Sequence, residues 1–70
     1  MSKLKLKQEE KRTMYINYID NMYCAIDEST GKSEFACYFW EDMRECIKVY
    51  QRIGCIIKYD DVVRALNFIA

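Results

Sequence analysis

Only two glycines, Gly31 and Gly54, and no proline interrupt this chain of 70 residues. Glycine and proline most often mark turns and loops, so the sequence offers few places for long connections. The chain is also 51% hydrophobic, whereas a chain of this size buries only about 60% of the surface that its unfolded form exposes. These features predict one small domain that has more apolar surface than its interior can bury.

We expect the first segment, residues 8–28, to be a helix. Its apolar side chains recur at spacings of one, three and four residues: Tyr15, Tyr18, Ile19, Met22, Tyr23 and Ile26. Apolar residues also alternate from Met14 to Tyr18 and from Met22 to Ile26, which is typical of strands. Because Asp20 interrupts that alternation and no polar residue interrupts the helical stripe, we favour the helix.

Two further helices are predicted beyond Gly31. Gly31 can end the first helix, and Ser33 can cap the second, which would end before Gly54. The expected inner stripe of this second helix comprises Ala36, Phe39, Trp40, Met43, Ile47, Tyr50 and Ile53. Residues 55–59 are a connector or a short strand. Asp60 can then cap a third helix, whose expected inner side chains are Val62, Val63, Leu66 and Ile69.

The sequence therefore predicts an all-α fold, a small three-helix domain. In this organisation residues 1–7 are a basic N-terminal arm and residues 8–70 are a single compact helical domain. The alternative is an α+β fold with a hairpin around residues 23–38, in which Tyr23–Asp27 pairs with Glu34–Tyr38. The apolar run Phe35–Trp40 would suit a buried strand in that arrangement.

The start of the chain and its hydropathy favour the cytoplasm. The first residues are charged and no apolar run of a secretory signal follows them. No apolar run reaches the roughly 20 residues that a membrane-spanning helix needs. We therefore expect a cytoplasmic protein with no membrane partner and with reduced thiols.

Catalytic, cofactor and metal sites are not predicted. Gly31, Lys32 and Ser33 match the end of a phosphate-binding loop, but Ile26 stands where that motif needs its first glycine. The four cysteines include no close pair of the kind found in zinc sites, and histidine is absent. Without histidine the chain also lacks the usual proton shuttle near pH 7. We expect a protein that is not an enzyme and has no cofactor.

A partner-binding surface is predicted around the aromatic run Phe35–Trp40. Six consecutive helical residues sweep far more than one face, so they cannot all pack into one core. Exposed aromatic side chains are common anchors of protein interfaces. Acidic residues flank this run, and residues 14–47 carry a net charge of −5. The predicted contacts are Phe35, Tyr38, Trp40, Glu34, Glu41, Asp42 and Glu45.

The function that fits best is a non-enzymatic protein-binding module. Residues with AT-rich codons are abundant, and small size and an acidic middle make a phage or mobile-element inhibitor of a host protein the most concrete form. Its target would be a protein with a basic nucleic-acid-binding groove, for example a nucleic-acid-binding defence effector. A homodimer that covers the aromatic residues fits equally well.

A second functional class uses the basic N-terminal segment. Residues 1–13 carry a net charge of +3, which a DNA-binding arm could use against phosphate. The alternative function is therefore a small dimeric DNA-binding transcriptional regulator. Its predicted nucleic-acid contacts are Lys3, Lys5, Lys7, Lys11 and Arg12.

Overall fold

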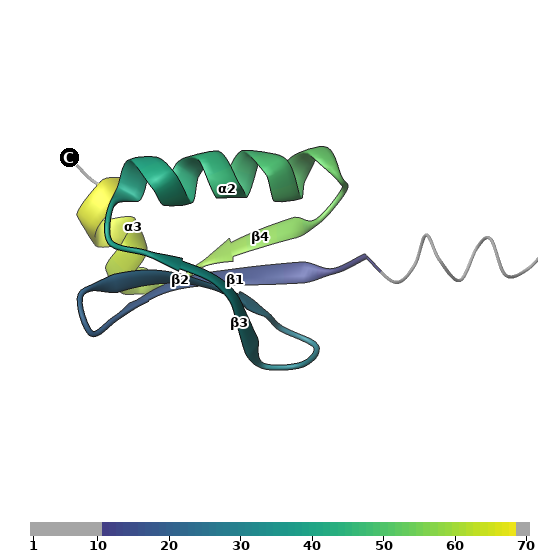
Figure 1. Cartoon of the computed structure of the whole chain (residues 1–70), viewed down its shortest axis with the longest axis horizontal. Coiled ribbons are helices and arrows are strands. Elements are labelled where there is room, and N and C mark those ends of the chain that lie inside the picture. The colour runs from purple at the N-terminus through teal and green to yellow at the C-terminus, as the bar shows by residue number, and fades with distance from the viewer. Residues whose placement is uncertain (1–10, 69–70) are drawn as a thin grey trace, which may run out of the picture.

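The structure, a computed structural model, describes residues 11–68 and is an α+β fold (Figure 1). Its elements are β1 (Thr13–Ile19), β2 (Met22–Asp27), β3 (Lys32–Cys37), α2 (Trp40–Arg52), β4 (Ile56–Tyr59) and α3 (Asp61–Asn67). The strands form one mixed sheet in the order β3-β2-β1-β4, in which only the β1–β4 pair is parallel. The prediction of an all-α three-helix domain is therefore wrong. The α+β alternative agrees with the structure, because β2 and β3 form the hairpin expected around residues 23–38.

The predicted first helix is instead the hairpin of β1 and β2. Asp20 and Asn21 have positive φ angles of 54° and 66° and form the two-residue turn. Two-residue hairpin turns favour this left-handed geometry, and Asp and Asn tolerate it better than most residues. Asp20, which argued against strands in the sequence, thus forms with Asn21 the turn that joins two alternating strands.

The second predicted helix is shorter than expected. Ser33 lies on β3 and does not cap a helix, while Phe39 precedes α2 without a side-chain hydrogen bond at the helix start. Gly31, with a φ angle of 75°, lies in the β2–β3 loop and donates its amide hydrogen to the Asp27 carbonyl oxygen at 2.7 Å. The predicted stop at Gly54 is confirmed, since this residue has a φ angle of 95° just after α2.

The third predicted helix is present as α3. The Asp60 carboxylate accepts a hydrogen bond from the Val62 amide at 3.1 Å, as its capping role requires. The same carboxylate accepts a hydrogen bond from the Tyr15 hydroxyl at 2.9 Å, which fixes α3 to β1. Val63 is fully buried, but Val62 and Leu66 are exposed and were wrongly expected to face inward. Ile69 lies outside the described residues.

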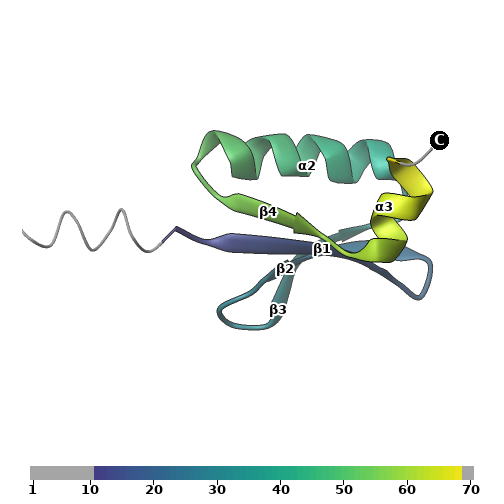
Figure 2. The same ribbon diagram turned by 180° about the vertical axis from the view of Figure 1, so that it is seen from behind.

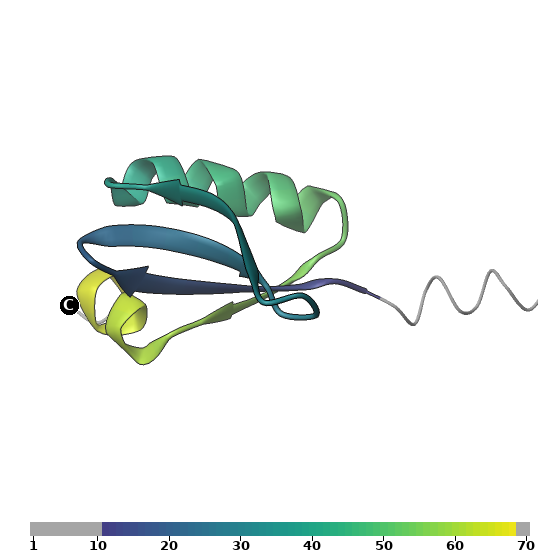
Figure 3. The ribbon, with the colours of Figure 1, turned by 60° about the horizontal axis from the view of Figure 1, so that its bottom comes forward.

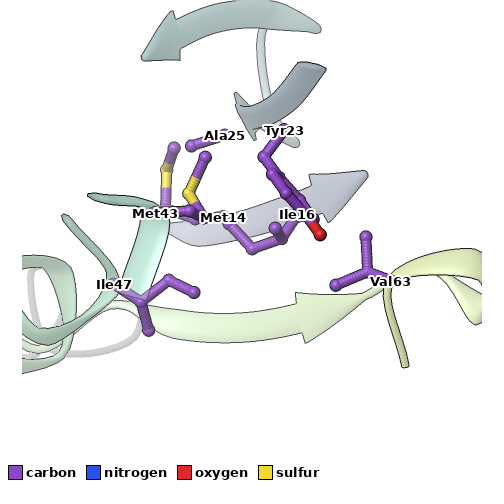
Figure 4. Packing of buried hydrophobic residues seen from close by; sticks show 7 residues of the cluster. All are labelled: Met14, Ile16, Tyr23, Ala25, Met43, Ile47 and Val63. Atoms are coloured by element: carbon purple, nitrogen blue, oxygen red, sulfur yellow. The ribbon is translucent and has the colours of Figure 1, made fainter. Parts of the chain in front are cut away.

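The buried core lies between one face of the sheet and α2, which runs along that face, with α3 at one end (Figures 1 and 2). Inward residues alternate along the two central strands, and α2 and α3 supply the rest. The core residues are Met14, Ile16, Tyr23, Ala25, Met43, Ile47 and Val63 (Figure 4). Half-buried Trp40 extends this cluster, because its ring contacts the rings of Tyr23 and Phe68.

Candidate partner-binding surface

β3 is an edge strand whose side chains are largely exposed, and it leads directly into α2 (Figure 3). Its register with β2 contains a bulge, because Ala25 pairs with Phe35 whereas Ile26 pairs with Ser33. Glu34 is therefore an extra residue on β3 without a cross-strand partner. A bulge of this kind redirects side chains locally. Here it lets both Glu34 and Phe35 face α2.

A groove of about 550 Å³ lies between β3 and α2. Its walls combine aromatic and aliphatic side chains with carboxylates. Strand β3 contributes Glu34 and Phe35, and α2 contributes Asp42, Glu45, Cys46, Val49 and Tyr50. Four of the seven predicted partner contacts thus come together in one concavity. Asp42 and Glu45 lie on a helix as expected, whereas Glu34 and Phe35 lie on a strand and not on that helix.

Glu34, one of the groove residues, binds an arginine from the segment just before β1. The Arg12 Nη2 donates hydrogen bonds to both carboxylate oxygens of Glu34, at 2.6 and 2.7 Å. Its Nε donates to Asp27 Oδ2 at 3.2 Å, and its guanidinium carbon lies 6.0 Å from the centre of the Tyr50 ring. Tyr50 donates its hydroxyl hydrogen to Glu34 Oε1 at 3.1 Å. This network links the start of β1 with β2, β3 and α2.

The pKa values of Asp27 and Tyr50 in this network are shifted in opposite directions. The pKa of Asp27 is lowered, first because the Ser29 hydroxyl and amide donate hydrogen bonds to it and then because Arg12 is close, although burial acts in the opposite direction. Burial, followed by the hydrogen bond to Glu34, raises the pKa of Tyr50 to about 12. Both directions keep the network in its hydrogen-bonded state near neutral pH.

The acidic side chains in the first two turns of α2 have few partners. The Glu45 Oε2 lies 3.3 Å from the Lys48 Nζ, but both side chains are well exposed. Exposed ion pairs of this kind contribute little to stability. Within residues 11–68, the carboxylates of Glu41 and Asp42 take part in no ion pair or side-chain hydrogen bond. This part of the surface therefore carries negative charge that the described residues do not balance.

The remaining predicted aromatic contacts separate into exposed and packed residues. Tyr38 is 66% exposed in the connection between β3 and α2. Trp40 is half-buried between Tyr23 and Phe68, with ring centres 5.4 and 5.6 Å away, so it serves the core as well as the surface. The sequence interpretation missed Phe39, which is 65% exposed although it was expected to face inward.

Phe39 was missed because the expected apolar stripe of the second helix included residues that lie on β3 and in the connection between β3 and α2. Val49 and Tyr50 were also not predicted as site residues, although both line the groove. The signal that could have located them is the spacing of three or four residues from Glu45 and Cys46, which places them on one side of the real helix. Ile53, expected inside, is exposed just beyond α2.

Of the five predicted nucleic-acid contacts, only Lys11 and Arg12 lie within the described residues. Lys3, Lys5 and Lys7, together with the predicted arm of residues 1–7, lie outside the described residues. Lys11 is exposed. Arg12 is held by Asp27 and Glu34, so a phosphate would have to compete with two carboxylates for its guanidinium.

The four cysteines are free and half-buried. Cys37 pairs in register with Tyr23 on the core face of the sheet, whereas Cys24 pairs with Ala36 on the opposite face, so these two thiols point apart. Burial raises the pKa of Cys46, and burial together with the charge of Asp42 raises that of Cys37. Higher thiol pKa values lower the fraction of reactive thiolate.

Across residues 11–68, no three Cys, Asp or Glu side chains are placed to share a metal ion. Neither helix in this range has the length and hydropathy needed to cross a membrane.

The groove offers rings and carboxylates at its surface, a composition suited to holding a cationic or aromatic group of a partner.

Comparisons with known proteins give no relative from which a function could be transferred. No protein-family model, curated protein or solved structure shows a significant match to this chain.

Proposed function

We propose that the protein is a non-enzymatic protein-binding module that acts in the cytoplasm through the surface formed by β3, α2 and their connection. In its most concrete form it is a phage or mobile-element inhibitor of a host protein. The target would present a basic nucleic-acid-binding groove, as a nucleic-acid-binding defence effector does.

The exposure of large apolar side chains next to unbalanced carboxylates carries this proposal. Phe35, Tyr38, Phe39 and Val49 are 37%, 66%, 65% and 48% exposed on this surface. Exposed aromatic residues that cluster beside a groove mark interaction sites more often than isolated apolar residues do. The acidic neighbours favour a positively charged target and disfavour binding to nucleic acid itself.

Affinity capture from the host cell tests the proposal if variants are compared. The bait proteins are the wild type, the double variant Tyr38→Ser/Asp42→Asn, and the control Asp20→Asn. The control removes one negative charge at a turn whose positive φ angle asparagine also tolerates. We expect a protein that is retained by the wild type and the control and is lost with the double variant. Equal retention by all three baits would contradict the proposal.

An inhibitor must also displace the nucleic acid of its target. A gel-shift competition with the captured protein and its nucleic acid measures this directly. The wild type should release the nucleic acid, and Tyr38→Ser/Asp42→Asn should not. The same assay with bare DNA at about physiological salt should show no shift; a salt-sensitive shift of bare DNA would support the alternative regulator.

A further inference from the structure

We propose that the groove between β3 and α2 recognises an arginine side chain of the partner protein. This inference rests on the proposed function and specifies the chemistry of the contact. The partner arginine would lie beside the Phe35 ring and form ion pairs with Asp42 and Glu45.

The chain contains its own example of this recognition at Glu34. There the Arg12 guanidinium donates to both oxygens of Glu34 and lies 6.0 Å from the Tyr50 ring centre. Glu34 and Tyr50 both line the groove. A carboxylate beside an aromatic ring is therefore a working guanidinium site in this protein.

The rest of the groove offers the same components without a comparable cation. Phe35 supplies a partly exposed ring, and Asp42 and Glu45 supply carboxylates on the facing turns of α2. Among the described residues only Lys48 pairs with Glu45, in an exposed contact, and Asp42 has no cationic partner. The charge and shape of this part of the groove therefore complement an incoming cation with a flat, weakly hydrated head.

Arginine fits these components better than lysine. The guanidinium is planar, so it can lie against a ring while its several N–H groups donate to two carboxylates. The lysine ammonium is compact and strongly hydrated, and it would gain mainly the ion pairs. Because exposed ion pairs alone are weak, the contact with the ring should discriminate between the two cations.

The test uses nuclear magnetic resonance titrations of the isotope-labelled full chain with two capped peptides, acetyl-Ala-Arg-Ala-Arg-Ala-amide and its lysine counterpart. We expect the arginine peptide to shift the amide signals of Phe35, Asp42, Glu45 and Val49 in a saturable way. It should bind about fivefold more tightly than the lysine peptide. Asp42→Asn/Glu45→Gln should weaken arginine binding about fivefold or more, and the control Asp20→Asn should leave it unchanged.

Several outcomes would overturn the inference. Equal affinity for both peptides would show that charge alone directs docking, and an absence of groove shifts with either peptide would show that the groove holds no arginine. Concentration-dependent shifts of the same signals without peptide, with light scattering of a dimer, would show that a second copy covers the groove. The capture experiment distinguishes these failures from failure of the proposed function, because groove-dependent capture of a partner would still stand.

Discussion

β1 and β3 flank β2 in the same sheet, but their side chains meet different surroundings. β1 is a central strand in which Met14 and Ile16 are fully buried under α2. β3 is an edge strand in which five of six residues are exposed and a bulge displaces Glu34 toward the groove. The comparison shows that a chain with abundant apolar residues uses one strand to build the core and leaves the other at the surface.

The edge position of β3 leaves one side of its backbone open to pairing. Exposed edge strands invite pairing with other chains, and proteins commonly protect them with bulges and charged side chains. β3 has both devices, the bulge and the charges of Lys32 and Glu34, yet it also presents Phe35. We infer that its surface is selective for a partner.

The largest expected effect is a loss of stability when β1 loses a buried side chain. Ile16→Ala should lower the free energy of unfolding by about 2–5 kcal/mol, because it removes a fully buried side chain and leaves a cavity. Phe35→Ala on β3 should cost less than about 1 kcal/mol, since that ring is partly exposed already. Urea denaturation of both variants measures the difference, and equal losses would remove the contrast between the strands.

Acid should weaken the ion pair between Arg12 and Asp27, which joins the segment before β1 to β2. The pKa of this carboxyl is lowered in the folded protein, so its stabilising contribution is present above the unfolded value of about 3.9 and is lost as the pH falls through the folded value. Asp27→Asn should therefore be less stable than the wild type at neutral pH, and the gap should narrow in acid. Urea denaturation at a series of pH values checks this; a gap that does not change with pH would argue against a role for the charge.

A smaller effect is expected from the Tyr50 hydroxyl at the groove. Tyr50→Phe removes the hydrogen bond to Glu34, which should cost about 1 kcal/mol. The raised pKa of about 12 means that the neutral phenol stabilises the fold below the unfolded value of about 10. This contribution disappears as the pH rises through 12. The wild type should thus lose part of its advantage over Tyr50→Phe in alkaline solution, as thermal unfolding at high pH can show.

The smallest effect on stability is expected at Tyr38. Its side chain is 66% exposed and makes no hydrogen bond to other described residues, so Tyr38→Ser should change the free energy of unfolding by no more than about 0.5 kcal/mol. Chemical denaturation provides the measurement. A loss of more than about 2 kcal/mol would mean that Tyr38 is part of the core.

The sequence indicated that some apolar residues would be buried and others exposed, but it did not establish that β1 and β3 are strands. Apolar residues alternate around Met14 and Ile16, yet the helical stripe that starts at Tyr15 has no polar interruption. Only the pairing of β1 with β2 decides between the two patterns. Asp20 looked like an interruption because its role depends on a backbone turn. In contrast, Gly54 correctly marked where α2 stops and Asp60 correctly marked where α3 starts, because the effects of both residues on the backbone are local.

The part of the candidate site that could be predicted is the part defined by residue type, acidic or aromatic. Glu34, Phe35, Asp42 and Glu45 were selected as an aromatic and acidic group, and the structure brings them to one groove. Trp40 could not be assigned from sequence, because its packing depends on Tyr23 and on Phe68 far along the chain. The engagement of Arg12 by Asp27 and Glu34 was likewise invisible, since it depends on the sheet register.

The most direct test of the account is the affinity of the captured partner for Tyr38→Ser and Ile16→Val, measured by isothermal titration calorimetry at a temperature where both variants are folded. We predict that Tyr38→Ser weakens binding about tenfold or more without loss of stability, because interface aromatic residues often contribute over 1 kcal/mol. Ile16→Val should cost about 0.5–1.5 kcal/mol of stability and bind as the wild type does. Binding that is unchanged in Tyr38→Ser and reduced in Ile16→Val would contradict the assignment of the β3–α2 surface as the binding site.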